Sequence, residues 1–136
     1  MFVTKSAETA SAGVGGKGGM PGGILAVSSN GKSANTGIVW ATVPISGDAN
    51  KFVVEGILRA YDASKLDPIS NLDGTRRLKL LWDSKHIPRN HFSFSKFCPP
   101  VIAHGKIFVP TYDGRVDVYS IVRPSGSGPL PTNANM

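Results

Sequence analysis

The residues best suited to bind a ligand lie between His86 and Phe97, in a connection rich in basic and aromatic side chains. Guanidinium, amide, imidazole and ammonium groups donate hydrogen bonds, which suits an anionic or polyhydroxylated protein or carbohydrate ligand. Because loops on a rigid scaffold often carry function, we expect ligand binding by Arg89, Asn90, His91 and Lys96. The alternative is a packing loop that buries three rings beneath the strands, namely Phe92, Phe94 and Phe97.

The other reactive residue types do not form a catalytic or metal-binding set. His86 and His91 have no carboxylate or thiol beside them in the sequence, and His104 falls in an expected turn. Cys98 has no adjacent His or basic residue, so we expect a half-buried small side chain and not a nucleophile. The Gly-Lys-Ser at 31–33 lacks the earlier glycine of a phosphate-binding loop. We therefore predict no catalytic residue and no metal site.

Composition restricts the class of protein. The chain has 136 residues with 16 Gly and 10 Pro, which favours many short strands joined by turns and hence an all-β fold. The net charge of +6 is scattered, and only Arg76 and Arg77 are adjacent among the basic residues, which argues against nucleic-acid binding. No apolar run approaches the length of about 18 residues that a membrane span needs. A single Cys leaves the redox compartment open.

Apolar and β-branched runs bounded by turn residues predict seven strands. We expect four strands in one antiparallel sheet, at 24–28, 38–43, 56–62 and 78–82, and three in a second, within 101–121. Residues 1–23 are Gly-rich and are expected to be flexible, and residues 123–136 are expected to form a disordered tail. The folded part is therefore predicted at 24–122.

The stretch from Cys98 to Ile121 is the clearest antiparallel meander in the sequence. His104-Gly105 and Asp113-Gly114 each separate β-branched or aromatic runs. Asp-Gly between two such runs favours a type I′ turn, in which both central residues have positive φ. We expect this turn at Asp113-Gly114.

The strands repeat in the same order. Segments 56–62 and 114–120 share the pattern G-x-[LV]-x-[AV]-Y at a separation of 58 residues. Two segments upstream also match in sequence: residues 24–26 align with residues 101–103, and residues 38–42 align with residues 107–111. A repeated four-stranded antiparallel unit is typical of β-propeller blades. The sequence therefore predicts one complete blade and one partial blade that lacks its fourth strand.

The strings GILRAYDA, LLWDS and PPVIAHGKIFVPTYDGRVDVY carry a family resemblance over residues 23–122. They resemble the blade repeat of quinoprotein-like propellers of the pyrroloquinoline-quinone type. The resemblance implies a non-catalytic scaffold or binding module, or alternatively the C-terminal piece of a quinone-dependent alcohol or sugar oxidoreductase. Only the alternative implies pyrroloquinoline quinone and calcium as cofactors. Export to the periplasm or the cell exterior is also implied by the resemblance.

The aromatic and glycine positions are expected to shape the blades. Tyr61 and Tyr119 should fill the wedges between neighbouring blades, and Trp82 should do so nearer the rim. Gly56 and Gly114 should close the turns before the third strands. Two blades cannot form a ring, so the chain is expected to be part of a larger propeller or to self-associate.

Overall fold

The computed structural model describes residues 24–66, 77–87 and 91–120. The expected flexible N-terminus and disordered tail lie outside these residues. Over the described residues the chain is all-β, with antiparallel sheets and one short 3-10 turn, η1 (Ser84–His86). No helix in this part of the chain is long and apolar enough to cross a membrane.

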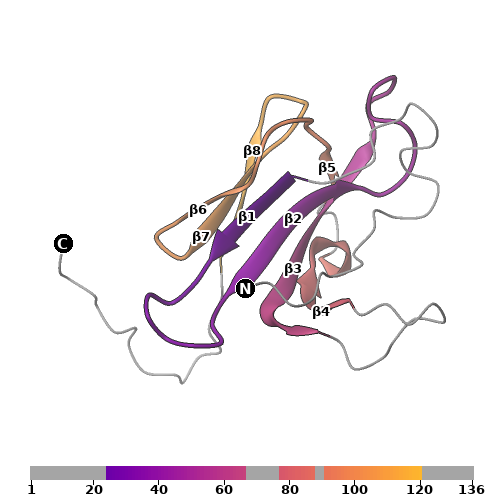
Figure 1. Ribbon diagram of the computed structural model, residues 1–136. Helices are drawn as coiled ribbons and strands as arrows, with labels where there is room; N and C mark the ends of the chain where they lie inside the picture. Colours follow the sequence, from indigo (N-terminus) through magenta and orange to yellow (C-terminus); the bar gives the residue numbers. More distant parts are fainter. Residues whose placement is uncertain (1–23, 67–76, 88–90, 121–136) are drawn as a thin grey trace.

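The first sheet contains the four strands that the sequence predicts. They are β1 (Ile24–Ser28), β2 (Ile38–Pro44), β3 (Glu55–Leu66) and β4 (Leu78–Asp83), hydrogen-bonded in chain order. Successive side chains of β2 and β3 point to opposite faces of the sheet, and both faces are packed, with Trp40 and Leu58 in one cluster and Ala41 and Ile57 in another. The strand prediction for this half of the chain is confirmed (Figure 1).

The second sheet contains three antiparallel strands, also in chain order. They are β6 (Val101–Ala103), β7 (Lys106–Pro110) and β8 (Val116–Ser120). The predicted three-stranded meander is therefore confirmed. The sheet lies against the first one, with β6 beside β1 (Figure 1).

The prediction of a type I′ turn at Asp113-Gly114 is wrong. Only Gly114 of this pair has a positive φ, at 79°, and its N–H donates to the Thr111 carbonyl at 3.2 Å. The loop is longer than the predicted two-residue turn, because the hydrogen bond that closes it runs from the Thr111 N–H to the Arg115 carbonyl, at 2.9 Å. Two adjacent positive φ angles occur instead at the β6–β7 hairpin, where His104 has 49° and Gly105 has 70°.

The connection before β6 has more order than a loop. Strand β5 (Phe92–Ser93) adds to the first sheet by pairing with Gly56 and Glu55 at the start of β3. Phe92 and Phe94 are buried, whereas Phe97 is 76% exposed. The packing interpretation of this segment therefore holds for two of its three aromatic rings and is wrong for Phe97.

The main core fills the space between the two sheets. The first sheet contributes Trp40, Leu58, Ala60 and Phe92, and the second contributes Ile107 and Val109. At the margin of this core the rings of Trp82 and Tyr119 meet edge to face, with centroids 5.8 Å apart. Burial of these apolar groups is the principal force that holds the sheets together.

Tyr61 and Tyr119 lie at matching positions of their sheets but in different environments. Tyr61 pairs with Val39, and Tyr119 pairs with Ile107. Ile107 therefore corresponds to Val39 and not to Ile38, so the sequence alignment of the repeat was wrong by one residue on this strand. Tyr119 packs in the core between the sheets, whereas Tyr61 packs against Ala41, Val43 and Ile57 on the opposite face of the first sheet.

Gly56 has a different role from the one predicted. It lies within β3, opposite Pro44 of β2 and Phe92 of β5, and not in a turn. A Cβ atom at this position would lie 2.3 Å from the Phe92 ring, so the glycine permits close contact between that ring and the β3 backbone. Gly114, by contrast, occupies a turn with positive φ, as expected.

The β7–β8 loop should make stability depend on pH. The pKa of Asp113 is lowered first by a hydrogen bond from the Thr111 hydroxyl, and further by the Arg115 guanidinium 2.9 Å away. A lowered folded-state pKa adds stability above the ordinary value of 3.8, and this stability is lost as the pH falls through the folded value. We expect Asp113→Asn to destabilise the protein at neutral pH and to have little effect in strong acid.

Urea unfolding of both proteins at a series of pH values from about 7 to about 2.5 measures this difference. The gap between wild type and Asp113→Asn should close as the carboxyl is protonated. A gap that stays constant across the series would show that the carboxylate charge does not stabilise the loop.

Candidate functional site

Of the four predicted ligand-binding residues the structure describes His91 and Lys96, and it places them apart. Arg89 and Asn90 lie outside the described residues. His91 precedes β5 and its Nδ1 contacts the Glu55 carboxylate at the start of β3. Lys96 lies beyond Phe94, and its Nζ donates to the Asn50 Oδ1 at 3.5 Å. His91 and Lys96 therefore have separate partners.

Two different hollows contain these side chains. His91 lines an open hollow of about 440 Å³ with Val53, Glu55 and Ser93. Lys96 lines a smaller one of about 140 Å³ with Phe52 and Tyr112. Val53 borders both hollows, so they are adjacent but distinct.

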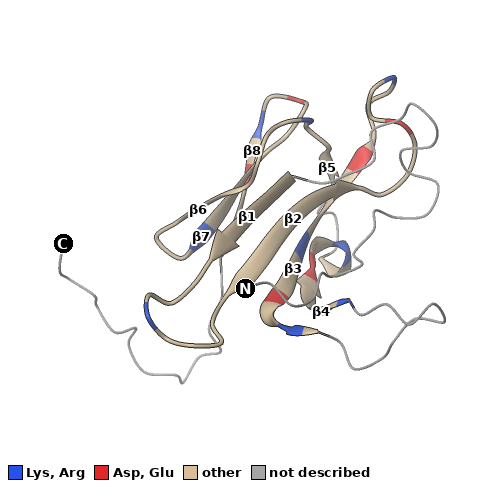
Figure 2. Cartoon of the chain, in the orientation of Figure 1, with Lys and Arg blue, Asp and Glu red and all other residues tan. Residues whose placement is uncertain are grey.

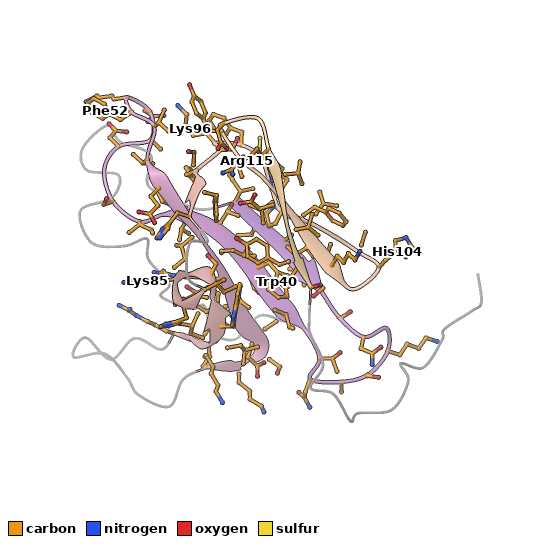
Figure 3. All side chains as sticks on the ribbon, turned by 180° about the vertical axis from the view of Figure 1, so that it is seen from behind. Trp40, Phe52, Lys85, Lys96, His104 and Arg115 are labelled. Carbon is orange, nitrogen blue, oxygen red and sulfur yellow. The ribbon has the colours of Figure 1, made fainter. Side chains whose placement is uncertain are left out.

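The hollow at Lys96 contains residues that the sequence interpretation missed. Phe52 is 69% exposed and Tyr112 is 61% exposed, beside the ammonium groups of Lys51 and Lys96. Figure 3 shows Phe52 and Lys96 at the same end of the molecule, far from His104. Exposed aromatic rings beside donors could stack on a sugar or hold an acidic peptide. The signal in the sequence was an aromatic residue directly after a polar turn, in Asn50-Lys51-Phe52.

The β2–β3 and β7–β8 loops build this hollow. Asp48 accepts hydrogen bonds from the N–H groups of Asn50, Lys51 and Phe52, which closes a compact turn. From the other side, the Tyr112 N–H donates to the Ser93 carbonyl at 2.9 Å. Lys51 also lies 3.6 Å from the Asp48 carboxylate. Part of the positive charge is therefore neutralised locally.

The histidines and the cysteine lie in separate environments. His86 ends η1, 3.6 Å from the Asp83 carboxylate, and His104 occupies the β6–β7 turn. Cys98 is half-buried and accepts a hydrogen bond from the Ser95 hydroxyl at 3.2 Å. The described ranges contain no group of three or more His, Cys, Asp or Glu side chains placed to hold a metal.

Charged residues are dispersed over the described surface. Figure 2 shows basic and acidic positions on several separate strands and loops, without a continuous basic stripe. A duplex nucleic acid is bound mainly by clustered Lys and Arg that contact phosphates. The described surface offers no such cluster.

Comparison of the chain with known protein families, curated proteins and solved structures found no significant match.

Proposed function

We propose that this chain is a non-catalytic, quinoprotein-like propeller module that serves as a scaffold or binding unit. The observation that carries the proposal is the way in which the two sheets stack. The face of the second sheet that carries Tyr119 packs on the first sheet, while the matching face of the first sheet, which carries Tyr61, points away. Equivalent faces therefore point in the same direction, as in a row of blades, and not toward each other.

The spacing of the sheets supports the same proposal. Strands β1 and β6, the first strands of the two units, lie side by side. At the other margin, an apolar cavity of about 470 Å³ lies between β4 and β8. Blades that radiate from a central channel are close at their first strands and diverge toward their last, which gives a wedge of this kind.

The outer face of the second sheet is suited to a further packing partner. Val101 lies opposite Phe108, and Phe108 lies opposite Val118, so three apolar side chains form a row across all three strands. Val101 and Val118 are each more than half exposed. Apolar rows of this kind are usually covered by another sheet or chain. We propose that remaining blades or a second copy of the chain cover this face.

Light scattering on the full chain tests this part of the proposal. We expect an assembly larger than the 14.3 kDa monomer, because the apolar row gains stability when it is covered. Val101→Lys should shift the population toward monomer, since a buried ammonium group is costly. Phe97→Lys is the matched control, because Phe97 is exposed but lies outside the strands of this face. A monodisperse wild-type monomer that melts cooperatively would contradict the proposal.

The non-catalytic assignment has a separate test. The intact mass of the protein from its source, with the sequence of its transcript, would reveal any further blades. We expect additional four-stranded repeats without a cluster of carboxylate and amide oxygens suited to calcium. A calcium-type cluster, together with quinone-dependent oxidation of an alcohol or sugar, would instead identify an oxidoreductase.

A further inference from the structure

The outer edge of β8 has backbone hydrogen-bonding groups that no other described strand uses. The Thr111 N–H donates to the Arg115 carbonyl, so alternate residues from Arg115 onward direct their N–H and C=O groups toward β7. The intervening residues, Val116, Val118 and Ser120, direct theirs away from β7. In the part of the chain that the structure describes, no strand pairs with this edge.

This edge lacks two of the usual protections against pairing, a Lys and a Pro, and the only charged side chain of β8 is that of Asp117. Val116 is 57% exposed and Val118 is 53% exposed, and β8 contains no Lys or Pro. Exposed edge strands commonly use such residues, or a covering loop, to prevent another strand from adding. The β8 edge therefore presents both open hydrogen-bonding groups and apolar side chains.

An apolar cavity lies directly beside this edge. It has a volume of about 470 Å³ and lies between β8 and the β4–η1 region of the first sheet. Its walls are mainly the side chains of Trp40, Leu81, Trp82, Ile87, Ile107 and Tyr119. Figure 3 shows Trp40 between the two sheets. A residue opposite Tyr119 on an added strand would share the inner face of the second sheet and so project toward this cavity.

The first sheet provides a template for the missing neighbour. Strand β4 pairs with β3 at the edge that corresponds to the open edge of β8, and Leu80 lies opposite Tyr61. Because Tyr119 corresponds to Tyr61, a strand like β4 on β8 would place an apolar residue opposite Tyr119. Trp82 of β4 already contacts Tyr119 from the other wall of the wedge.

A second copy pairing through its own β8 fits this edge less well in the register centred on Val118. In an antiparallel pairing centred on Val118, Asp117 of one copy would lie opposite Tyr119 of the other. A carboxylate would then approach the apolar cavity, at a cost in desolvation. The cavity favours a strand that carries an apolar side chain at this position.

We propose that the β8 edge and the adjoining cavity bind an extended peptide segment of another protein. The peptide adds a fourth strand to the second sheet and inserts a large apolar side chain beside Tyr119. Backbone hydrogen bonds to the edge provide affinity, and the cavity provides selectivity for that side chain. The inference does not depend on the propeller proposal, because the open edge and the cavity are present whichever assembly covers the outer face.

Backbone hydrogen exchange on the full chain tests the proposal. The probe is a fluorescent synthetic peptide that copies residues 77–84, with blocked ends. We expect the amides of Val116, Val118 and Ser120 to exchange fast in the free protein and to become protected when the probe is added. If these amides are already protected in dilute protein without the probe, another segment of the same chain occupies the edge, and the proposal is overturned. If protection of these amides rises with protein concentration in the absence of the probe, a second copy of the chain occupies the edge, and the proposal is likewise overturned.

Fluorescence anisotropy with the same probe adds a test by substitution. Val118→Pro removes an outward N–H without removing a bond to β7, and should weaken binding about tenfold or more. Val118→Thr keeps the N–H and is the matched control, with affinity close to wild type. Leu81→Glu places a carboxylate at the cavity and should weaken binding about fivefold or more, even if the proline variant does not fold.

A probe in which the residue equivalent to Leu80 is replaced by Asp should bind more weakly than the original peptide, because that residue is directed to the cavity. Equal binding of the original probe to wild type and to both Val118→Pro and Leu81→Glu would overturn the proposal, as would a failure of the original probe to bind wild type.

Discussion

Replacement of Trp40 by alanine lowers the free energy of unfolding by about 3–5 kcal/mol, the range expected for loss of a buried Trp side chain. Trp40 is only 8% exposed and belongs to the core that joins the two sheets. Its indole N–H donates to the Ser28 hydroxyl at 2.9 Å, which also connects β2 to β1. Removal of the ring therefore leaves a cavity between the sheets and breaks a cross-strand hydrogen bond.

Two further variants separate these contributions. Ser28→Ala removes only the acceptor and should cost about 1 kcal/mol, a typical value for one hydrogen bond. Phe52→Ala is the control for an aromatic residue outside the core, and should change stability by less than about 0.5 kcal/mol. Urea unfolding at equal protein concentration measures all of them. A loss below about 1 kcal/mol for Trp40→Ala would show that the sheets are not held together by this core.

Introduction of a methyl group at Gly56 is expected to destabilise the protein by about 1–3 kcal/mol, as overpacking does in a well-packed core. The added Cβ would lie 2.3 Å from the nearest atom of the Phe92 ring, and Phe92 is itself buried. The ring or the β3 backbone must therefore move. Since β5 pairs with β3 at this point, Gly56→Ala should loosen β5 first.

A double-mutant cycle tests whether this contact is the cause. Phe92→Leu reduces the side chain that Gly56→Ala would meet, so the double variant should be more stable than the sum of the two single effects predicts. Gly31→Ala is a control with free space around its Cβ, although its φ of +54° still disfavours alanine. Strict additivity of the Gly56 and Phe92 substitutions would exclude the steric explanation.

The strands were predictable because their signals are local. Alternating side chains and the turn residues that follow them mark β1, β2, β3 and β4 in the sequence, and the structure has the same strands in the same order. Strand β5 carries only two residues, which is too short for a periodic pattern. Its partner, the start of β3, lies far earlier in the chain, so only the folded sheet reveals the pairing.

The candidate site was less predictable for a related reason. The sequence placed His91 and Lys96 in one polar loop, but the short strand between them directs them to different hollows. Phe52 and Tyr112 come from two other loops and meet Lys96 only after both sheets have formed. Contacts between loops depend on how strands pair and stack, and no local pattern encodes them.

The amino-acid sequence by itself determined the class of fold, the strand order and the two antiparallel units, because strand propensity and turn geometry act between near neighbours. The tertiary structure decided which face each strand buries. Side chains alternate along a strand, so two residues one position apart point to opposite faces of the sheet. Aligning Ile107 with Ile38 in place of Val39 therefore assigns its side chain to the wrong face. Backbone register and the packing of the two sheets set that choice, and with it the apolar wedge between β4 and β8.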